Sequence, residues 1–337
     1  MDETRFGTRD RRGHYVPKDP IASPPVYAMP PRPKRVLSWL VGHDGYLFPW
    51  NAVLFAIAAG IWVLLTPPME TMATLSPGWI LYLLARNAVL ITLFFGAFHL
   101  RLYMKQKQGS AFKYNPKFPE KAGQRGFLFG SQTRENVFWT LCSGVPIWTA
   151  YEVVMLWLFA SGKLPWLSFA DSPVWFVLFM ALIPIWREFH FYCIHRLIHW
   201  GPFYRWIHKL HHNNVNPGPW SSLSMHPVEH ALYFSVVLIH VILPSHPLHA
   251  LYSLHHAAFG SLIGHIGFDK VVTGDRSAMD THAYAHYLHH KFFEVNYGDG
   301  LVPLDRVFGT FHDGTPEGDR AMDARRRRRM QSQRQAG

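Results

Sequence analysis

The sequence predicts an all-α integral membrane protein: a bundle of about four transmembrane helices plus a re-entrant hairpin, with a histidine-rich helical cap on the cytoplasmic side. Composition is the first reason, because 49% of the 337 residues are hydrophobic and only 16% are charged, against about 25% charged in soluble domains. The second reason is a series of apolar runs near the roughly 20 residues that a helix needs to cross a bilayer. The third is a set of histidines that follows these runs.

Residues 1–45 are rich in Arg, Lys and Pro and contain no apolar core, so we expect no signal peptide here. We expect a mostly extended arm on the membrane surface, and a disordered tail is the alternative. The net charge of +11 suits a membrane surface that carries anionic lipid. Nucleic-acid binding is the competing interpretation of a basic chain. It is disfavoured because the basic residues flank apolar segments.

The transmembrane region is expected to cover residues 46–184. Ser76-Pro77-Gly78 forms a turn between the first two apolar runs, which therefore make a helical hairpin. A hairpin buried in a soluble protein is the alternative. Glu152 lies inside the third run, where an acidic residue faces a partner or a cavity, and it is a candidate for the wall of a substrate channel. The four runs are 48–65, 79–98, 137–160 and 173–186.

Charge fixes the expected orientation of these runs. The arm and the loop 99–135 are both strongly basic, and the positive-inside rule places both in the cytoplasm. The loop 161–172 has one lysine and no arginine, as expected outside. The fourth run therefore returns to the cytoplasm. Two shorter runs, 231–243 and 248–263, predict the re-entrant hairpin, with two full crossings as the alternative; both bring the chain back to the cytoplasm.

Three histidine clusters follow in residues 185–312. Residues three and four apart share a face of a helix, so each cluster can aim at one spot. Imidazole binds iron, copper, nickel and zinc, and eight imidazoles suit two metals better than one. Structural zinc sites usually include thiolates, but Cys142 and Cys193 lie in apolar stretches. We therefore expect a pair of redox metals, against the alternative of isolated polar histidines. The clusters are His195/His199, His208/His211/His212 and His286/His289/His290.

The clusters lie in a longer pattern, which consists of Phe191-Tyr192-x-x-His195-Arg196-Leu197-x-His199, Tyr204-x-x-x-His208-Lys209-x-His211-His212, His226-Pro227-x-Glu229, His286-x-x-His289-His290 with Asn296-Tyr297-Gly298, and Asp305-Arg306-x-Phe308-Gly309-Thr310. This pattern resembles the fatty acid hydroxylase / sterol desaturase superfamily over roughly residues 185–312. The resemblance implies a membrane-bound oxidoreductase with two non-haem iron ions. Such an enzyme uses dioxygen to hydroxylate or desaturate a lipid of the sterol or fatty acyl class.

The resemblance also implies the site residues. The eight clustered histidines are carried over as iron ligands, together with His265, whose segment His265-x-Gly267-Phe268-Asp269 resembles one in methyl-sterol oxidases. No catalytic residue is assigned beyond the ligands. His190 and His230 are expected to support the motifs or to lie on the surface. Residues expected either to bind metal or to orient a ligand imidazole are His226, His282, Glu188, Glu229 and Asp269.

Electrons must come from a separate protein, because no Gly-x-Gly-x-x-Gly follows a predicted strand and no haem domain is apparent. We expect an acidic carrier, a b-type cytochrome or a ferredoxin with its reductase, steered by the basic cytoplasmic face. The other expected partners are the lipid substrate and the bilayer. The tail 313–337 ends with the arginine run 325–329, which suits solvent or lipid headgroups.

Two other classes of protein use such histidines. One is a membrane metal-binding or metal-transport protein without oxygen chemistry, but transporters place ligands at mid-membrane, whereas these clusters follow helix ends. The other is a structural membrane protein with a dead site, which would have lost motif histidines, and all eight are present. Hydroxylases and desaturases share the first hydrogen abstraction, so both reactions remain open.

Overall fold

The computed structural model describes residues 1–120 and 123–336, and helices dominate it. The helical character of the chain and its long apolar helices are confirmed. Within these residues, three helical stretches are long and apolar enough to cross a bilayer, Pro77–Met104, Gln132–Ala160 and Pro173–Ile198. The first predicted run, 48–65, forms the shorter apolar helix α2, Trp50–Leu65, of 16 residues.

Proline sets the limits of these helices. α4, Pro77–His99, and α7, Pro173–Ile198, each begin with proline at a first-turn position, where its missing N–H costs nothing. α2 ends at the pair Pro67-Pro68, which cannot continue it. The third stretch consists of α5, Gln132–Trp139, a π-helical turn η5, Thr140–Gly144, and α6, Val145–Ala160. η3, Leu100–Met104, extends α4, and α3, Met69–Met72, lies between α2 and α4.

A buried polar contact joins α4 to α6. Arg86 and Glu152 form an ion pair there, and the Asn87 side-chain amide donates to Glu152 Oε2 at 2.8 Å. Charges at membrane depth need such partners. Glu152 therefore faces a partner, and the contact provides no support for a place in a channel wall.

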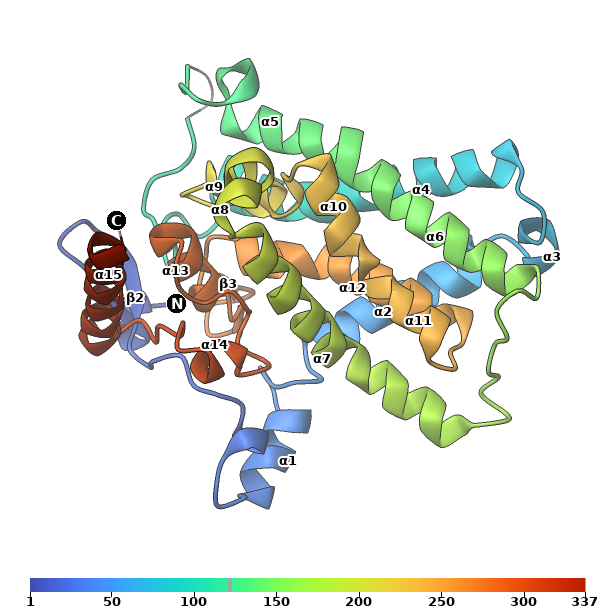
Figure 1. The fold of residues 1–337 in the computed structure, drawn as a ribbon, viewed down its shortest axis with the longest axis horizontal. Helices are drawn as coiled ribbons and strands as arrows, with labels where there is room; N and C mark the ends of the chain where they lie inside the picture. The colour runs from blue at the N-terminus through green and yellow to red at the C-terminus, as the bar shows by residue number, and fades with distance from the viewer. Residues whose placement is uncertain (121–122, 337) are drawn as a thin grey trace.

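The two shorter apolar runs become α10, Pro227–Phe234, with η8, Ser235–Leu238, and α11, Ile239–Ile242, and then α12, Pro247–His265. α12 runs through the middle of the bundle, against α2, α6 and α7 (Figure 1). Most of its side chains are buried. α12 therefore connects the bundle core to the histidine-bearing end, where it finishes with His265.

The histidine-bearing elements form a cap at one end of the bundle, opposite α3 (Figure 1). Its central helix α13 carries the last histidine cluster, and the chain ends in α15, a helix that the sequence reading did not predict. The cap elements are α8 Gly201–Phe203, η6 Tyr204–His208, α9 Lys209–His212, η7 Pro219–Leu223, β3 Lys270–Val272, β4 Ala278–Asp280, α13 Tyr284–Phe292, α14 Leu304–Val307 and α15 Pro316–Ala336.

The N-terminal arm is more structured than expected. It forms an antiparallel hairpin of β1, Gly7–Arg9, and β2, Tyr15–Pro17, and then a helix α1, Pro33–Val41. Tyr15 is buried at the edge of the Phe112 ring, with 5.7 Å between ring centroids. Both rings belong to a buried cluster with Tyr284 and Tyr287 of α13, and this cluster holds the arm against the cap. The short helices η1, Glu3–Arg5, η2, Pro25–Tyr27, and η4, Leu128–Gly130, complete the element order.

Candidate metal centre

The structure brings together all nine histidines that the sequence reading assigned to metal. They form two groups, and within each group the candidate ligand atoms all lie within 4.8 Å of one another. The five-histidine group contains His195, His199, His208, His212 and His289, and the four-histidine group contains His211, His265, His286 and His290. All are buried except His199, which is half-buried. Each group can hold one metal ion.

Neighbouring histidines on one helix serve different groups. His211 and His212 on α9 are adjacent in sequence, yet one belongs to each group, and the same holds for His289 and His290 on α13. Consecutive side chains on a helix point about 100° apart. Each H-x-x-H-H motif therefore supplies both groups and holds them side by side.

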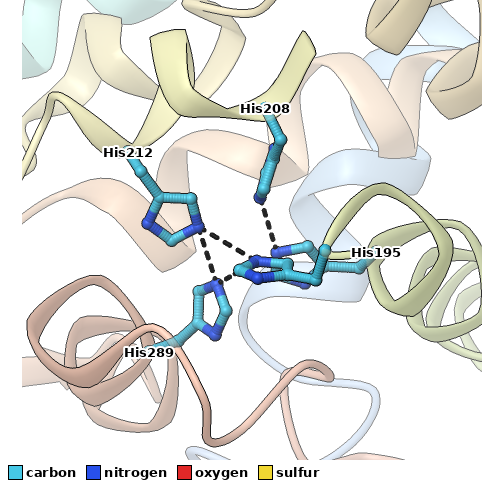
Figure 2. Close-up of side chains that lie close together, drawn as sticks. His195, His208, His212 and His289 are labelled. Carbon is cyan, nitrogen blue, oxygen red and sulfur yellow. Dashed lines mark hydrogen bonds between the residues drawn. The ribbon is translucent and has the colours of Figure 1, made fainter. Parts of the chain in front are cut away.

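The imidazole rings turn their Nε2 atoms toward one another. Figure 2 shows this for His195, His208, His212 and His289, which come from α7, η6, α9 and α13. The Nε2 atoms of His195 and His208 are 3.1 Å apart, as are those of His212 and His289. In the other group the His265 Nε2 lies 3.1 Å from that of His211 and 2.9 Å from that of His286.

The opposite ring nitrogens fix the tautomers. The Nδ1 atom of His195 lies 2.6 Å from the Tyr297 carbonyl oxygen, and that of His289 lies 2.7 Å from the Val295 carbonyl oxygen. A carbonyl can only accept, so Nδ1 carries the proton and Nε2 presents a lone pair. The Nδ1 atoms of His265 and His211 meet the carbonyl oxygens of Ser261 at 2.9 Å and Ser224 at 3.3 Å in the same way.

This tautomer pattern fits a bound cation in each group. Lone pairs that face one another at about 3 Å repel, and a positive ion between them converts the repulsion into coordination. The donor set consists of imidazole nitrogen alone, which suits iron, copper, nickel and zinc.

Burial favours the neutral form of the grouped histidines in the cap. Burial lowers the pKa of His208, His211 and His290 well below the usual value, and the neighbouring histidines lower it further. Neutral imidazole is the form that binds metal.

Glu229 is the predicted carboxylate that contacts a grouped histidine. Its Oε1 lies 2.7 Å from Nδ1 of His208, and both side chains are buried. The carboxylate accepts a hydrogen bond from Nδ1–H of His208 and leaves Nε2 free to point at the group, as outer carboxylates do in metal sites.

The other candidate residues lie outside both groups. Nδ1 of His226 accepts from the backbone N–H of Val228 at 3.2 Å, which caps α10. The side chain of His282 is 54% exposed and pairs with Asp280. These two positions therefore give no support to a ligand role.

The two remaining carboxylates contact other partners. Glu188 accepts from the backbone N–H of Gly300 at 2.8 Å, and Asp269 accepts from the Tyr114 hydroxyl at 3.2 Å. His190 and His230 are hydrogen-bonded to serines, at 2.9 Å and 3.0 Å. These contacts hold the surrounding elements.

Sequence reasoning missed Asp299. Its Oδ1 lies 3.4 Å from Nδ1 of His286, and its other oxygen pairs with Arg187 of α7. The residue stands directly after Asn296-Tyr297-Gly298, but no spacing rule links it to a histidine 13 positions earlier. The carbonyl oxygens that orient the rings belong to the backbone, so no residue type in the sequence identifies them.

A chamber of about 570 Å³ lies near the two histidine groups, although none of the nine grouped histidines lines it. Its wall is formed by the arm, α2, α7, α12 and the cap. A small pocket of about 30 Å³, lined by His195, His211, His265 and His286 among others, borders it. Arg187, Gly260, Gly264 and Asp299 line both spaces. The two glycines of α12 and the Arg187–Asp299 pair thus form the boundary between chamber and histidines.

All nine grouped histidines lie in a part of the chain that matches a known protein family. Residues 176–310 match the model of the fatty acid hydroxylase family. A Delta(7)-sterol 5(6)-desaturase of Gibberella zeae is 30% identical over 148 residues, which cover 42% of this chain and 40% of that protein. One from Aspergillus fumigatus is 31% identical, covering 44% of this chain and 53% of that protein. A putative methylsterol monooxygenase of Dictyostelium discoideum is 30% identical, covering 37% of this chain and 47% of that protein.

These matches cover about half the length of the curated relatives or less. No solved structure matches the chain.

Proposed function

We propose that this chain is a member of the fatty acid hydroxylase / sterol desaturase superfamily, whose model residues 176–310 match, and that it is a membrane-bound oxidoreductase that hydroxylates or desaturates a lipid with dioxygen. The observation that carries the proposal is the pairing of two imidazole groups with a neighbouring chamber. Metal ions explain the facing lone pairs, and the chamber offers space for an apolar molecule beside them. The names of the relatives favour a sterol as substrate.

We assign iron to both groups, with the nine grouped histidines as ligands. A pair of irons supplies the means to activate dioxygen and remove hydrogen from an unactivated C–H bond, which no side chain can do. Glu229 holds the Nδ1 proton of His208, and the Tyr297 and Val295 carbonyls hold those of His195 and His289. These contacts keep each Nε2 lone pair directed inward throughout a reaction.

The chamber residues position the substrate and exclude water. Gly260 and Gly264 carry no side chain on the face of α12 that borders the pocket, so a lipid can approach the four-histidine group closely. Arg187 and Asp299 pair across the same boundary, and Asp299 also faces His286. We assign this pair a positioning role, because it connects the substrate wall to a ligand ring.

The proposed orientation places the cap in the cytoplasm. The basic arm and loop 99–135 lie at the cap end of the bundle, as the positive-inside rule requires. Arg205 and Lys209 are exposed beside His208, the ligand between them in sequence. This basic surface suits an acidic electron carrier, a b-type cytochrome or a ferredoxin with its own reductase.

Metal analysis tests the proposal. The purified full chain is loaded with ferrous iron, washed and analysed by elemental mass spectrometry, and we expect two irons per chain. His211→Ala with His212→Ala removes one ligand from each group and should abolish tight binding of both. His226→Ala is the matched control, because His226 lies outside both groups, and it should keep both irons.

Lipid profiling tests the reaction. A host that expresses the wild-type chain should accumulate an oxidised or unsaturated lipid that a host with the double alanine variant lacks. Zinc alone after iron loading, or identical lipid profiles in the two hosts, contradicts the proposal. A metal-transport function is disfavoured, because a closed set of oriented ligands beside a lipid-sized chamber serves no purpose in ion release.

A further inference from the structure

Helix α1 stands at the edge of the chamber. Trp39, Asp44 and Gly45, at the end of α1 and just beyond it, line the chamber, and they also line an open groove of about 390 Å³. The remaining groove residues are Lys34, Arg35, Ser38 and His43. We call this the mouth groove. It continues the chamber outward along the surface of α1.

α1 has the surface of a helix that binds a membrane interface. None of its nine residues is buried, and Leu37 and Val41, four apart on one face, are 60% and 61% exposed. Lys34 and Arg35 are exposed beside that face, and the helix contains no acidic residue. An apolar stripe with a basic flank suits the boundary between headgroups and acyl chains of anionic lipid.

The position of α1 is fixed by the bundle. The Trp39 ring packs on Tyr46, with 5.1 Å between ring centroids, and the Tyr46 hydroxyl donates to the Ala181 carbonyl oxygen of α7. Figure 1 shows α1 standing off from the bundle beside α7, near the cap. A nine-residue helix binds a bilayer weakly alone, but tethering to a membrane helix gives it a high effective concentration at the surface.

We propose that α1 lies in the anionic leaflet on the cap side and forms the threshold over which a lipid passes sideways from the bilayer into the chamber. The basic residues of the mouth groove hold lipid headgroups at the threshold, and Leu37 and Val41 dip among the acyl chains. The identity of the passing lipid as substrate rests on the proposed function. The depth of α1 in the bilayer does not.

Spin labelling of the full chain tests the depth. Cys142 and Cys193 are exposed and are replaced by serine, and a nitroxide is placed at Leu37→Cys or, as the matched control one position on, at Ser38→Cys. The protein is reconstituted in bilayer discs of phosphatidylcholine with phosphatidylserine. We expect oxygen to relax the label at position 37 more than a water-soluble nickel chelate does, and the reverse at position 38. Equal nickel accessibility at both positions overturns the proposal.

The charge requirement has its own comparison. Lys34→Gln with Arg35→Gln should lower the ratio of membrane-inserted to water-exposed label at position 37 by roughly 30-fold in anionic discs. Each basic residue near an anionic surface contributes about five-fold to this ratio, and two of them are removed. Arg327→Gln with Arg328→Gln removes the same charge from the exposed tail and should leave the label in place. An equal shift from both pairs overturns the assigned role of α1.

Activity separates the threshold from the proposed function. Leu37→Asp with Val41→Asp should raise the KM for lipid presented in a bilayer while the iron content and the KM for lipid in detergent micelles stay unchanged. Val26→Asp with Met29→Asp is the matched control, because both side chains are exposed in the arm and line neither the chamber nor the mouth groove. An unchanged bilayer KM overturns the entrance role. If the wild-type chain oxidises no lipid, the proposed function fails, and the spin-label result still decides where α1 lies.

Discussion

Removing the carboxylate of Glu229 should loosen one metal position without unfolding the protein. Glu229 Oε1 accepts a hydrogen bond from Nδ1–H of His208 at 2.7 Å, and both side chains are buried. In Glu229→Ala the N–H is left without an acceptor, and an unsatisfied buried donor costs about 1–3 kcal/mol. The ring of His208 can then rotate or change tautomer, so we expect iron affinity in the five-histidine group to fall by about 10- to 100-fold.

Competition with a coloured iron chelator measures this affinity in detergent solution. Glu229→Gln keeps an acceptor oxygen but loses the charge, so its affinity should lie between those of the wild type and Glu229→Ala. Glu70→Ala is the control, because Glu70 is exposed on α3 at the far end of the bundle. Wild-type iron affinity in Glu229→Ala, together with lost affinity in His208→Ala, would refute the idea that the carboxylate orients the ligand.

Three further outcomes are expected. Gly264→Ile should place a side chain beside the ring of His286, because a Cβ at position 264 would lie 3.8 Å from that ring. The side chain should block lipid from the histidine groups, so elemental analysis should still find both irons while turnover is lost. Burial and then the charge of Asp280 raise the pKa of Asp269 to about 7. Because the folded pKa lies above the unfolded one, the free energy of unfolding falls as pH rises from about 4 to 7. In Asp269→Asn the denaturation midpoint should therefore change less with pH over this range, and at pH 8 it should be higher than that of the wild type. Arg86→Ala leaves Glu152 buried without its cation and should cost about 3–5 kcal/mol, measured by steric trapping in bilayers, and Arg86→Met with Glu152→Gln should recover most of it.

The sequence predicted the helices well because their signals are local. Apolar runs and flanking prolines determine where α4 and α7 begin and end. α12 was harder, since its run contains several histidines and is short for a crossing. Its burial is a tertiary property: the helix is enclosed by α2, α6 and α7, and its residues need not match the bilayer. α1 was missed because nine residues opened by proline carry too weak a periodic signal in a basic arm.

For the site, motif spacing identified nine histidines that the fold brings together, but it did not divide them into two groups. That division depends on which way each ring turns, and backbone carbonyls set the direction. The Tyr297 and Val295 oxygens act through the main chain, so any residue type at those positions could supply them. Asp299 depends on a turn that returns the chain past α7, which no local pattern encodes.

The adjacent histidine pairs on α9 and α13 have a consequence for assembly. α9 contributes one ring to each group, and α13 contributes one ring to the five-histidine group and two to the other. A shift of either helix by a single residue would therefore move its rings away from both groups together. The two histidine groups therefore form together when α9 and α13 dock, and both are disrupted when either helix undocks. Undocking of either helix would remove ligands from both groups at once.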